Sequence, residues 1–427
     1  MVDVANIHLP VLLDDCVNLM APALEHENAI AVDCTLGLAG HSIAFLKAAP
    51  QARLIGIDRD SEALGLATER MEREGLADRF IPVHAAFDQL DQVLADQDIE
   101  RVDAVFMDLG LSSLQIDETD RGFSYSHDAP LDMRMDVSQP LTAERILATY
   151  DAAELVRIFK EYGEERFSRQ IARAIVARRD KEPFTTTAQL NRLVDEVVPQ
   201  AHRPAGNPAK RVFQALRIEV NGELDKLAST LPQAANRLHV GGRLVVESYH
   251  SLEDKTVKSF MAQGLRVDVP AGLPVIPPDA QPFFTDLTRG AIKADEHEIA
   301  ANPRSASVRL RAVEVSREIP SRWRKRFTQT AQGLNDVKIQ GSASPGRAKT
   351  RHEFVQGGDN SIWQLHVAFD RTRLQPRTDR TPSISPPPDL SCGWSPTRVE
   401  TSRAMSSDGS SNGPEQEAHR WCTWPLQ

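Results

Sequence analysis

Short apolar runs alternate with amphipathic segments along the first third of the chain. Four runs have the length and composition of buried strands: "AIAVDCT" from Ala29, "ARLIGIDRD" from Ala52, "FIPVHAAF" from Phe80 and "VDAVFMDLG" from Val102. Segments with helical spacing, such as "GHSIAFLKAAP" and "SEALGLATERMEREG", lie between them. Strands that alternate with helices form parallel sheets covered on both faces, so we predict a doubly wound α/β fold. Ligands of such sheets bind beyond the carboxyl ends of the strands.

The alternation stops after the fourth strand. From about Leu114 to Arg217 the pattern predicts turn-rich segments and then helices, without a buried strand. The sheet pattern resumes with a long helix over "VFQALRIEVNGELDKLASTLPQAANRL", a strand over "GGRLVVESYHS" and a last strand from Ser305 to Val315. After about Ile319 the chain is rich in Pro, Ser and Gly and poor in apolar residues, which predicts a disordered tail.

The glycine-rich turn after the first strand lets a small ligand approach the backbone. A phosphate-binding P-loop needs Gly-Lys-Ser/Thr, but here Gly40 is followed by His41 and Ser42, which excludes a nucleoside triphosphate. A dinucleotide site would read GxGxxG, whereas this turn has Gly37, Ala39 and Gly40. The turn therefore fits a ligand without phosphates.

The ends of the next three strands supply groups for such a ligand. Asp58 ends the second strand, where a carboxylate accepts both ribose hydroxyls of NAD or of S-adenosylmethionine. Phe87 follows the third strand, where its ring can pack on an adenine. Asp108 ends the fourth strand, where a carboxylate helps to hold a cationic donor; the alternative for Asp108 is a helix or turn cap.

Composition and charge restrict the class of protein. The chain has 427 residues and a net charge of −10, no apolar run of the ~20 residues that span a bilayer, and no secretory signal. We therefore expect a cytoplasmic protein with no membrane partner. Between Arg166 and Arg217, however, eleven Lys and Arg face four Asp and Glu, and such a basic patch can bind a phosphate backbone or be a solvated helical face. The four cysteines have no zinc-site spacing, so we expect no metal.

The motifs along the chain closely resemble those of the bacterial 16S ribosomal RNA (cytosine-N4) methyltransferases, the MraW or RsmH family. The match runs from "HLPVLL" at His8 to "NPRSASVRLRAVE" ending at Glu314. It passes through "DCTLGLAGHS", "GIDRD", "DLGLSS", "RGFSY", "PLDMRMD", "PAKRVFQALRIEVN" and "SYHSLED". One departure is Ala39, which stands where the family commonly has glycine and is tolerated there if its φ is negative. Another is Glu247, which stands where the family commonly has an apolar residue, in a strand that we expect to be buried.

The resemblance implies a class I, Rossmann-like methyltransferase core with an inserted all-helical domain and a disordered C-terminal tail. We place the core at 1–113 and 213–318, the inserted substrate-recognition domain at 114–212 and the tail at 319–427. The implied donor is S-adenosylmethionine and the implied partner is 16S ribosomal RNA or the small ribosomal subunit; the oligomeric state is left open, with a homodimer allowed. The donor-binding positions carry over to Ala39, Gly40, His41, Asp58, Phe87, Asp108 and Gln115, of which His41 and Gln115 come from the resemblance alone.

The reaction that the resemblance implies is attack of an exocyclic cytosine nitrogen on the sulfonium methyl. That amine is a weak nucleophile, so the protein must position it and accept hydrogen bonds from its N–H groups, for which Asp108 and Ser112 are candidates. His250 or Asp132 can accept the released proton, as can water. For His250 the alternative is a helix cap, and for Asp132 an ion pair with Arg134.

Three other functions fit the sequence less well. An NAD-dependent oxidoreductase lacks its GxGxxG fingerprint here. A non-catalytic RNA-binding protein does not need the two carboxylates Asp58 and Asp108. The third is a small-molecule or DNA N-methyltransferase. DNA amino-methylases carry a Pro-Pro-aromatic turn after the fourth strand, whereas this chain has "LGL", so we expect no DNA substrate. In the helical region, Arg169, Arg173, Arg178 and Arg179 have the spacing to share part of one helix face and to contact the RNA backbone.

Overall fold

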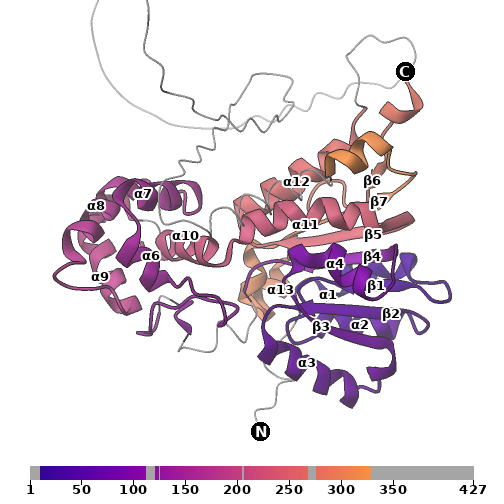
Figure 1. Ribbon diagram of the computed structural model, residues 1–427, viewed down its shortest axis with the longest axis horizontal. Coiled ribbons are helices and arrows are strands. Elements are labelled where there is room, and N and C mark those ends of the chain that lie inside the picture. Colours follow the sequence, from indigo (N-terminus) through magenta and orange to yellow (C-terminus); the bar gives the residue numbers. More distant parts are fainter. Residues whose placement is uncertain (1–9, 112–120, 125, 204–205, 268–275, 328–427) are drawn as a thin grey trace, which may run out of the picture. The chain divides into compact units, whose positions relative to one another are not determined.

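A computed structural model describes residues 10–111, 121–124, 126–203, 206–267 and 276–327 of the chain. Its centre is a seven-stranded sheet in the order β3-β2-β1-β4-β5-β7-β6 (Figure 1). Strands β1 to β5 run parallel, while β7 pairs antiparallel with both β5 and β6. The strands are β1 (Ile30–Asp33), β2 (Arg53–Asp58), β3 (Phe80–His84), β4 (Val102–Asp108), β5 (Leu238–Ser248), β6 (Phe284–Asp286) and β7 (Arg309–Val315).

The six strands expected from the apolar runs are confirmed, and β6 was not expected. The doubly wound α/β prediction is confirmed for β1 to β5, with the antiparallel β7 as the departure from an all-parallel sheet. The direction in which strands are added to the sheet reverses between β1 and β4. Strands β2 and β3 lie on one side of β1, and the chain then crosses to β4 on its other side. The carboxyl ends of β1 and β4 therefore lie side by side at the switch point, where open α/β sheets bind ligands.

Helices cover both faces of the sheet because alternate residues of each central strand point to opposite sides. In β4, Ala104 and Phe106 join an apolar cluster with α1 and α2, whereas Val105 and Met107 join a second cluster with α4, α11 and α12. The helices around the sheet are α1 (Leu13–Met20), α2 (Gly40–Ala48), α3 (Ser61–Arg73), α4 (Leu90–Asp96), α11 (Glu223–Arg237), α12 (Ser251–Leu265) and α13 (Glu296–Ala301).

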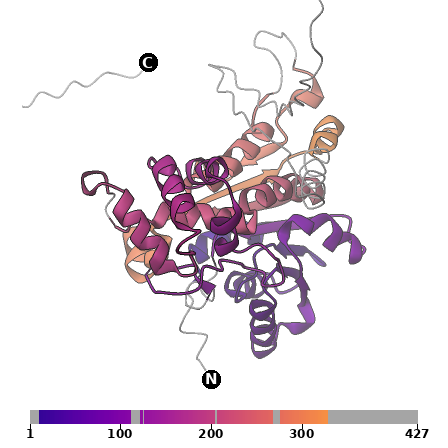
Figure 2. The same cartoon turned by 60° about the vertical axis from the view of Figure 1, so that its left-hand side comes forward.

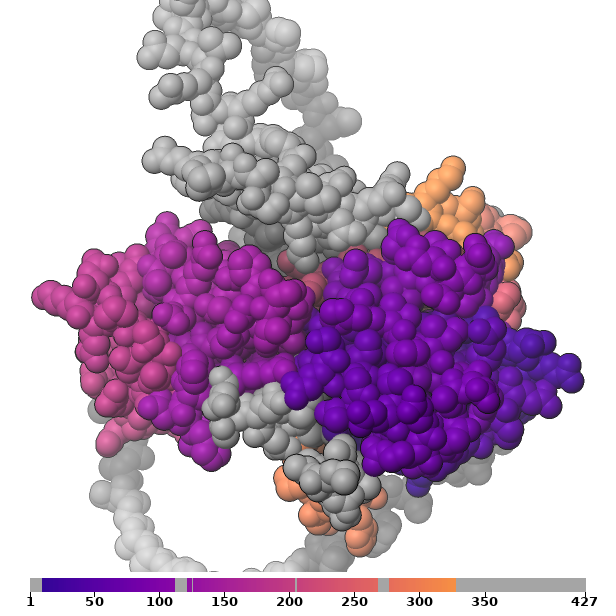
Figure 3. Space-filling view, turned by 60° about the horizontal axis from the view of Figure 1, so that its bottom comes forward, coloured from indigo at the N-terminus to yellow at the C-terminus, as the bar shows by residue number. Residues whose placement is uncertain are grey.

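A third apolar cluster is built by the helices that follow β4 in sequence. Threonine and aspartate caps start two of them, since the side chains of Thr142 and Asp151 accept backbone N–H groups of the first turns. At a third helix start, the Gln189 side chain accepts the Thr186 backbone N–H. These helices, called the helical segment below, are drawn in magenta to pink in Figures 2 and 3. Its helices are α6 (Ala143–Thr149), α7 (Ala152–Glu161), α8 (Ser168–Arg178), α9 (Thr187–Val197) and α10 (Lys210–Asn221).

The long helix expected before the fifth strand is in fact two helices, α10 and α11. They meet at Gly222, whose φ of 60° ends one helix and starts the next. A left-handed residue at a helix end is a position that glycine adopts without steric cost. Packing also differs on the two sides, because Phe213 and Leu216 belong to the helical cluster and Leu227 and Leu231 to the sheet. The boundary at residue 212 stays a prediction, and this packing favours Gly222.

The start of the tail at residue 319 stays a prediction, and the packing of the next residues favours a later start. Ile319, Trp323 and Phe327 are each under 10% exposed and pack with Phe283 and Phe260 beside β6. Trp323 and Phe327 are four residues apart in the helical stretch 321–327 and so share one helix face, while Ile319 lies just before it. The core therefore extends to 327, and the remainder of the tail lies outside the described residues. Among the helices described, none combines the length and the apolar character needed to cross a bilayer.

Candidate active site

The turn after β1 is held by a buried carboxylate that the sequence did not single out. Asp33 is 1% exposed, and its Oδ1 accepts the backbone N–H of Thr35 at 3.0 Å while its Oδ2 accepts the Ser42 hydroxyl at 2.6 Å. Thr35 in turn accepts the backbone N–H of Asp108 at 2.6 Å through its Oγ1. The turn is thereby fixed to the first turn of α2 on one side and to the tip of β4 on the other.

Asp58 closes the turn from the end of β2. Its Oδ2 accepts the backbone N–H of Gly37 at 2.8 Å, and its Oδ1 accepts that of Asp60 at 2.8 Å. Burial raises the pKa of Asp58, although these two hydrogen bonds act in the opposite direction. A carboxylate has about four lone-pair sites, so two backbone bonds leave capacity for two ribose hydroxyls.

The condition for tolerating alanine at position 39, a negative φ, is not met. Ala39 has φ 60° and ψ 25° and lies in the left-handed region as the N-cap of α2. Its side chain is fully buried, and its backbone N–H donates to the Leu36 carbonyl at 2.8 Å, so the surrounding turn fixes the conformation. Next to it, a Cβ on Gly40 would lie 2.6 Å from Cγ of Pro10, which shows that Gly40 allows the N-terminal segment to approach the turn.

We predict that Ala39→Gly stabilises the protein by about 1 kcal/mol. The left-handed conformation costs an L-residue roughly 1–2 kcal/mol, which exceeds the extra chain entropy that glycine loses on folding. Urea denaturation measures the difference. The control is Ala95→Gly at an exposed position of α4, which we expect to destabilise the protein by about 1 kcal/mol. Destabilisation by both glycines would contradict the explanation.

Asp108 and His41 meet between the tip of β4 and the first turn of α2. The Asp108 side chain is 28% exposed, and its Oδ2 lies 3.8 Å from Nδ1 of the buried His41. Burial raises the pKa of Asp108 to about 7, with the side chains of Tyr249 and Glu247 acting in the opposite direction and Glu253 in the same direction. The other ring nitrogen of His41, Nε2, lies 2.9 Å from the Val11 carbonyl oxygen and therefore donates a hydrogen to it. Burial lowers the pKa of His41.

The structure thus brings five of the predicted donor-binding residues together around one turn: Ala39, Gly40, His41, Asp58 and Asp108. Phe87 is half-buried just after β3, whose last residue His84 pairs with Asp58. Ser112 and Gln115 lie outside the described residues.

His250 occupies the N-cap of α12. Its Nδ1 accepts the backbone N–H of Glu253 at 3.4 Å, and the Glu253 carboxylate accepts the backbone N–H groups of Tyr249 and His250. Burial acts to raise the pKa of Glu253, but His250 and Arg217 outweigh it and the pKa is lowered. The capping alternative for His250 is therefore confirmed, and its role as a proton acceptor stays a prediction.

Asp132 forms the ion pair that its sequence context offered as an alternative. Both of its oxygens accept from the Arg134 guanidinium, at 2.8 and 2.7 Å. Burial acts to raise the pKa of Asp132, but the bonds with Arg134 lower it overall, which disfavours uptake of a proton. Asp132 as a proton acceptor stays a prediction.

Hydrogen bonds from Arg59, just after β2, connect the sheet to the helical segment, and the sequence does not indicate them. The Arg59 guanidinium, one residue after Asp58, donates to the Asn221 carbonyl at 3.3 Å and to the Gln139 side chain at 3.2 Å. The Asn221 side chain in turn holds the backbone of Met133 and Met135. These partners are 80 to 162 residues apart in sequence, so only the fold reveals them.

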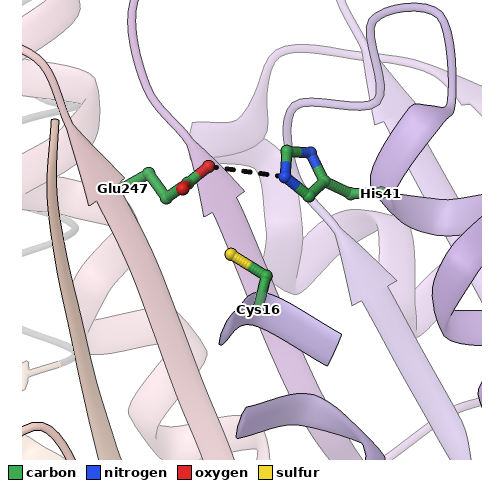
Figure 4. Close-up of side chains that lie close together, drawn as sticks. All are labelled: Cys16, His41 and Glu247. Carbon is green, nitrogen blue, oxygen red and sulfur yellow. Dashed lines mark ion pairs between the residues drawn. The ribbon is translucent and has the colours of Figure 1, made fainter. Parts of the chain in front are cut away.

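Glu247 lies beside the Asp108 and His41 pair and is completely buried, as expected for its strand. It is the register partner of Asp108 on β5, so the two side chains lie on the same face of the sheet. Neither carboxylate oxygen has a hydrogen-bond partner among the described residues, and Nε2 of His41 lies 3.6 Å from its Oε2 (Figure 4). Burial raises the pKa of Glu247, and the nearby Asp108 raises it further.

The strand order, the switch-point turn and its two flanking aspartates define a Rossmann-like methyltransferase core of class I. Residues 5–316 match the profile of the MraW methylase family, and this chain belongs to that family. Its methyl donor is S-adenosylmethionine.

Relatives in this family cover most of the chain. The ribosomal RNA small subunit methyltransferase H of Bifidobacterium longum subsp. infantis is 97% identical over 82% of this chain and 97% of its own length. The protein of the same name from Clavibacter michiganensis is 54% identical over 73% of this chain and 98% of its own. A solved rRNA methylase from Streptococcus thermophilus aligns at a TM-score of 0.32 and 12% identity over 73% of this chain and 99% of that one, a likeness too weak to carry an argument.

Proposed function

We propose that the protein transfers the methyl group of S-adenosylmethionine to the exocyclic N4 amine of a cytidine in small-subunit (16S) ribosomal RNA. The family and the names of its relatives support a small-subunit rRNA substrate. The observation that supports attack by an amine is the partly exposed Asp108 carboxylate at the tip of β4, next to the donor turn. A carboxylate there can accept an N–H of the amine and hold its lone pair toward the sulfonium methyl.

The cysteines favour nitrogen over carbon as the methylated atom. Methylation at carbon 5 of cytosine generally needs a thiolate that attacks the ring. In the described part of the chain, Cys16 lies in α1 and Cys34 follows β1, and both are buried. Burial raises the pKa of both thiols, which disfavours the nucleophilic thiolate. N4 methylation does not require a thiol.

The direct test uses small ribosomal subunits that lack the modification. We expect incubation with isotopically labelled S-adenosylmethionine to give labelled N4-methylcytidine, identified by mass spectrometry after digestion to nucleosides. Label in 5-methylcytidine, in another nucleoside or in protein would contradict the proposal. Naked 16S rRNA, used in parallel, shows whether the enzyme needs the assembled subunit.

The helical segment supplies the basic residues that we propose contact the RNA backbone. Arg169 and Arg173 are exposed and four residues apart on α8. Arg178 is exposed too, but it pairs with Glu196 at 2.6 Å. Arg179 is half-buried and donates to the Leu147 carbonyl at 3.2 Å, so it serves the fold of the segment instead.

We predict that the double charge reversal Arg169→Glu/Arg173→Glu weakens rRNA binding about 10-fold or more and reduces the salt dependence of log Kd by about two units. Donor affinity should not change, because α8 contributes no residue to the donor turn. Filter binding at several salt concentrations and calorimetry with the donor measure the two effects. Arg53→Glu, at an exposed position of β2 outside the segment, is the control that should bind rRNA normally. Equal losses of rRNA and donor affinity would contradict this division of labour.

A further inference from the structure

Three side chains of different chemistry converge in the buried space beneath the donor turn. Cys16 comes from α1, His41 from the first turn of α2 and Glu247 from β5, and each is less than 10% exposed. One sulfur, one nitrogen and one oxygen atom of this trio lie within 4.8 Å of one another. Figure 4 shows the three side chains pointing toward a common point from three elements.

The Glu247 carboxylate is buried without a hydrogen bond to any described residue. Both of its oxygens are fully buried, and the Cys16 thiol and His41 ring lie next to them. Buried carboxylates are normally hydrogen-bonded, paired or bound to a metal, because an isolated buried charge is very costly. Asp33 and Asp108 lie nearby and add negative charge to the same region.

We propose that Cys16, His41 and Glu247 bind a divalent transition-metal ion of the zinc type. A thiolate, an imidazole and a carboxylate are the ligands of Zn²⁺ and Co²⁺, whereas Mg²⁺ and Ca²⁺ prefer oxygen alone. One thiolate and one carboxylate also balance the two positive charges of the ion, so the occupied site is neutral. The spacing of the cysteines could not predict such a site, because its three residues are far apart in sequence.

The distance between the His41 and Glu247 ligand atoms is close to that of a tetrahedral site. Bonds of roughly 2.0–2.3 Å to zinc place neighbouring ligand atoms roughly 3.5 Å apart. Nε2 of His41 and Oε2 of Glu247 are already 3.6 Å apart. The Cys16 sulfur lies within 4.8 Å of these atoms and would have to move closer to bind the ion. Nε2 of His41 would give up the hydrogen that it donates to the Val11 carbonyl oxygen, 2.9 Å away, and that oxygen or a water can take the fourth position.

Asp108 would become an outer partner of this site. A metal on Nε2 of His41 leaves the ring hydrogen on Nδ1, which lies 3.8 Å from Oδ2 of Asp108. Metal-bound histidines usually donate their other ring nitrogen to a carboxylate in this way, which fixes the ring. The ion would therefore tie α1, α2 and β5 together and set the orientation of the histidine in the donor turn.

The test is a Co²⁺ titration of the full chain after treatment with a chelator. We expect one Co²⁺ per chain and a near-ultraviolet absorption band from thiolate to metal. Cys16→Ser should abolish the band, and Glu247→Gln should weaken Co²⁺ binding at least about 10-fold because one charged ligand is lost. The matched control replaces Cys34, Cys392 and Cys422 by serine and leaves Cys16, and this variant should keep the band.

Circular dichroism of each variant shows that it is folded, and both substitutions are nearly isosteric. A wild-type chain that binds no Co²⁺ would overturn the proposal, as would a band that survives Cys16→Ser. Binding that is unchanged in Glu247→Gln would remove Glu247 from the site and equally overturn it. None of these results depends on methyl transfer, so the metal site and the proposed function fail or succeed separately.

Discussion

Replacing Asp108 by asparagine is expected to slow methyl transfer about 100- to 1,000-fold while the protein stays folded. The carboxylate is the partly exposed acid at the tip of β4, and removal of one preorganised group that stabilises a transition state costs about this much. Asparagine keeps the shape of the side chain but not the charge. Its amide still offers one oxygen to the amine, so binding of rRNA should change little.

Single-turnover rates with labelled donor and small subunits measure this effect. Donor affinity, followed by calorimetry, should fall much less than the rate, because Asp58 and the turn still hold the nucleoside. Asp78→Asn, at an exposed position far in sequence from the turn, is the matched control and should have the wild-type rate. An Asp108→Asn variant with a rate within about threefold of wild type would contradict the assignment of Asp108 to the reacting amine.

Gly122→Ala is expected to lower the free energy of unfolding by about 3 kcal/mol or more. Gly122 has φ 69°, and a Cβ there would lie 1.9 Å from the Pro130 carbonyl oxygen and 3.4 Å from the Asp132 nitrogen. These are backbone atoms and cannot rotate away, so the contact between the "RGFSY" and "PLDMRMD" segments must open. That loss adds to the cost of a left-handed alanine.

Gly75→Ala separates the two contributions. Gly75 has nearly the same φ, 70°, but a Cβ on it meets no atom within 4 Å. Gly75→Ala should therefore lower the free energy of unfolding by only about 1–2 kcal/mol, the penalty of the backbone conformation alone. Urea denaturation of both variants gives the comparison, and equal losses would show that the close approach of the two segments contributes nothing to stability.

The sequence predicts the sheet well because its strands are apolar runs bounded by turn residues. It misses the break at Gly222, since the apolar spacing continues through the glycine and only its left-handed backbone separates α10 from α11. It also misses the helical stretch 321–327, because four Lys and Arg residues surround its two buried apolar residues, Trp323 and Phe327. In both places tertiary packing decides what local composition does not.

Asp58, Phe87 and Asp108 could be proposed as donor-binding residues because each lies at or after a strand end, and the strand ends of a parallel sheet meet at one edge. His41 and Gln115 come from the family resemblance alone. The sequence gives no comparable signal for Arg59, whose partners lie in a segment more than 75 residues away. Nor does it indicate that Ala39 adopts a positive φ, because the conformation follows from how Leu36, Asp58 and Pro10 constrain the turn. Long-range contacts, and not residue types, determine these features.

The central claim is that the turn between β1 and α2, closed by Asp58, binds S-adenosylmethionine. Calorimetric titration of the donor into the full chain and into Asp58→Ala tests it most directly. We predict one donor per wild-type chain and an affinity about 10- to 100-fold lower in the variant, since hydrogen bonds to a charged group are worth about 1.5–3 kcal/mol. A wild-type chain that binds no donor, or equal affinities in the two proteins, would contradict the account.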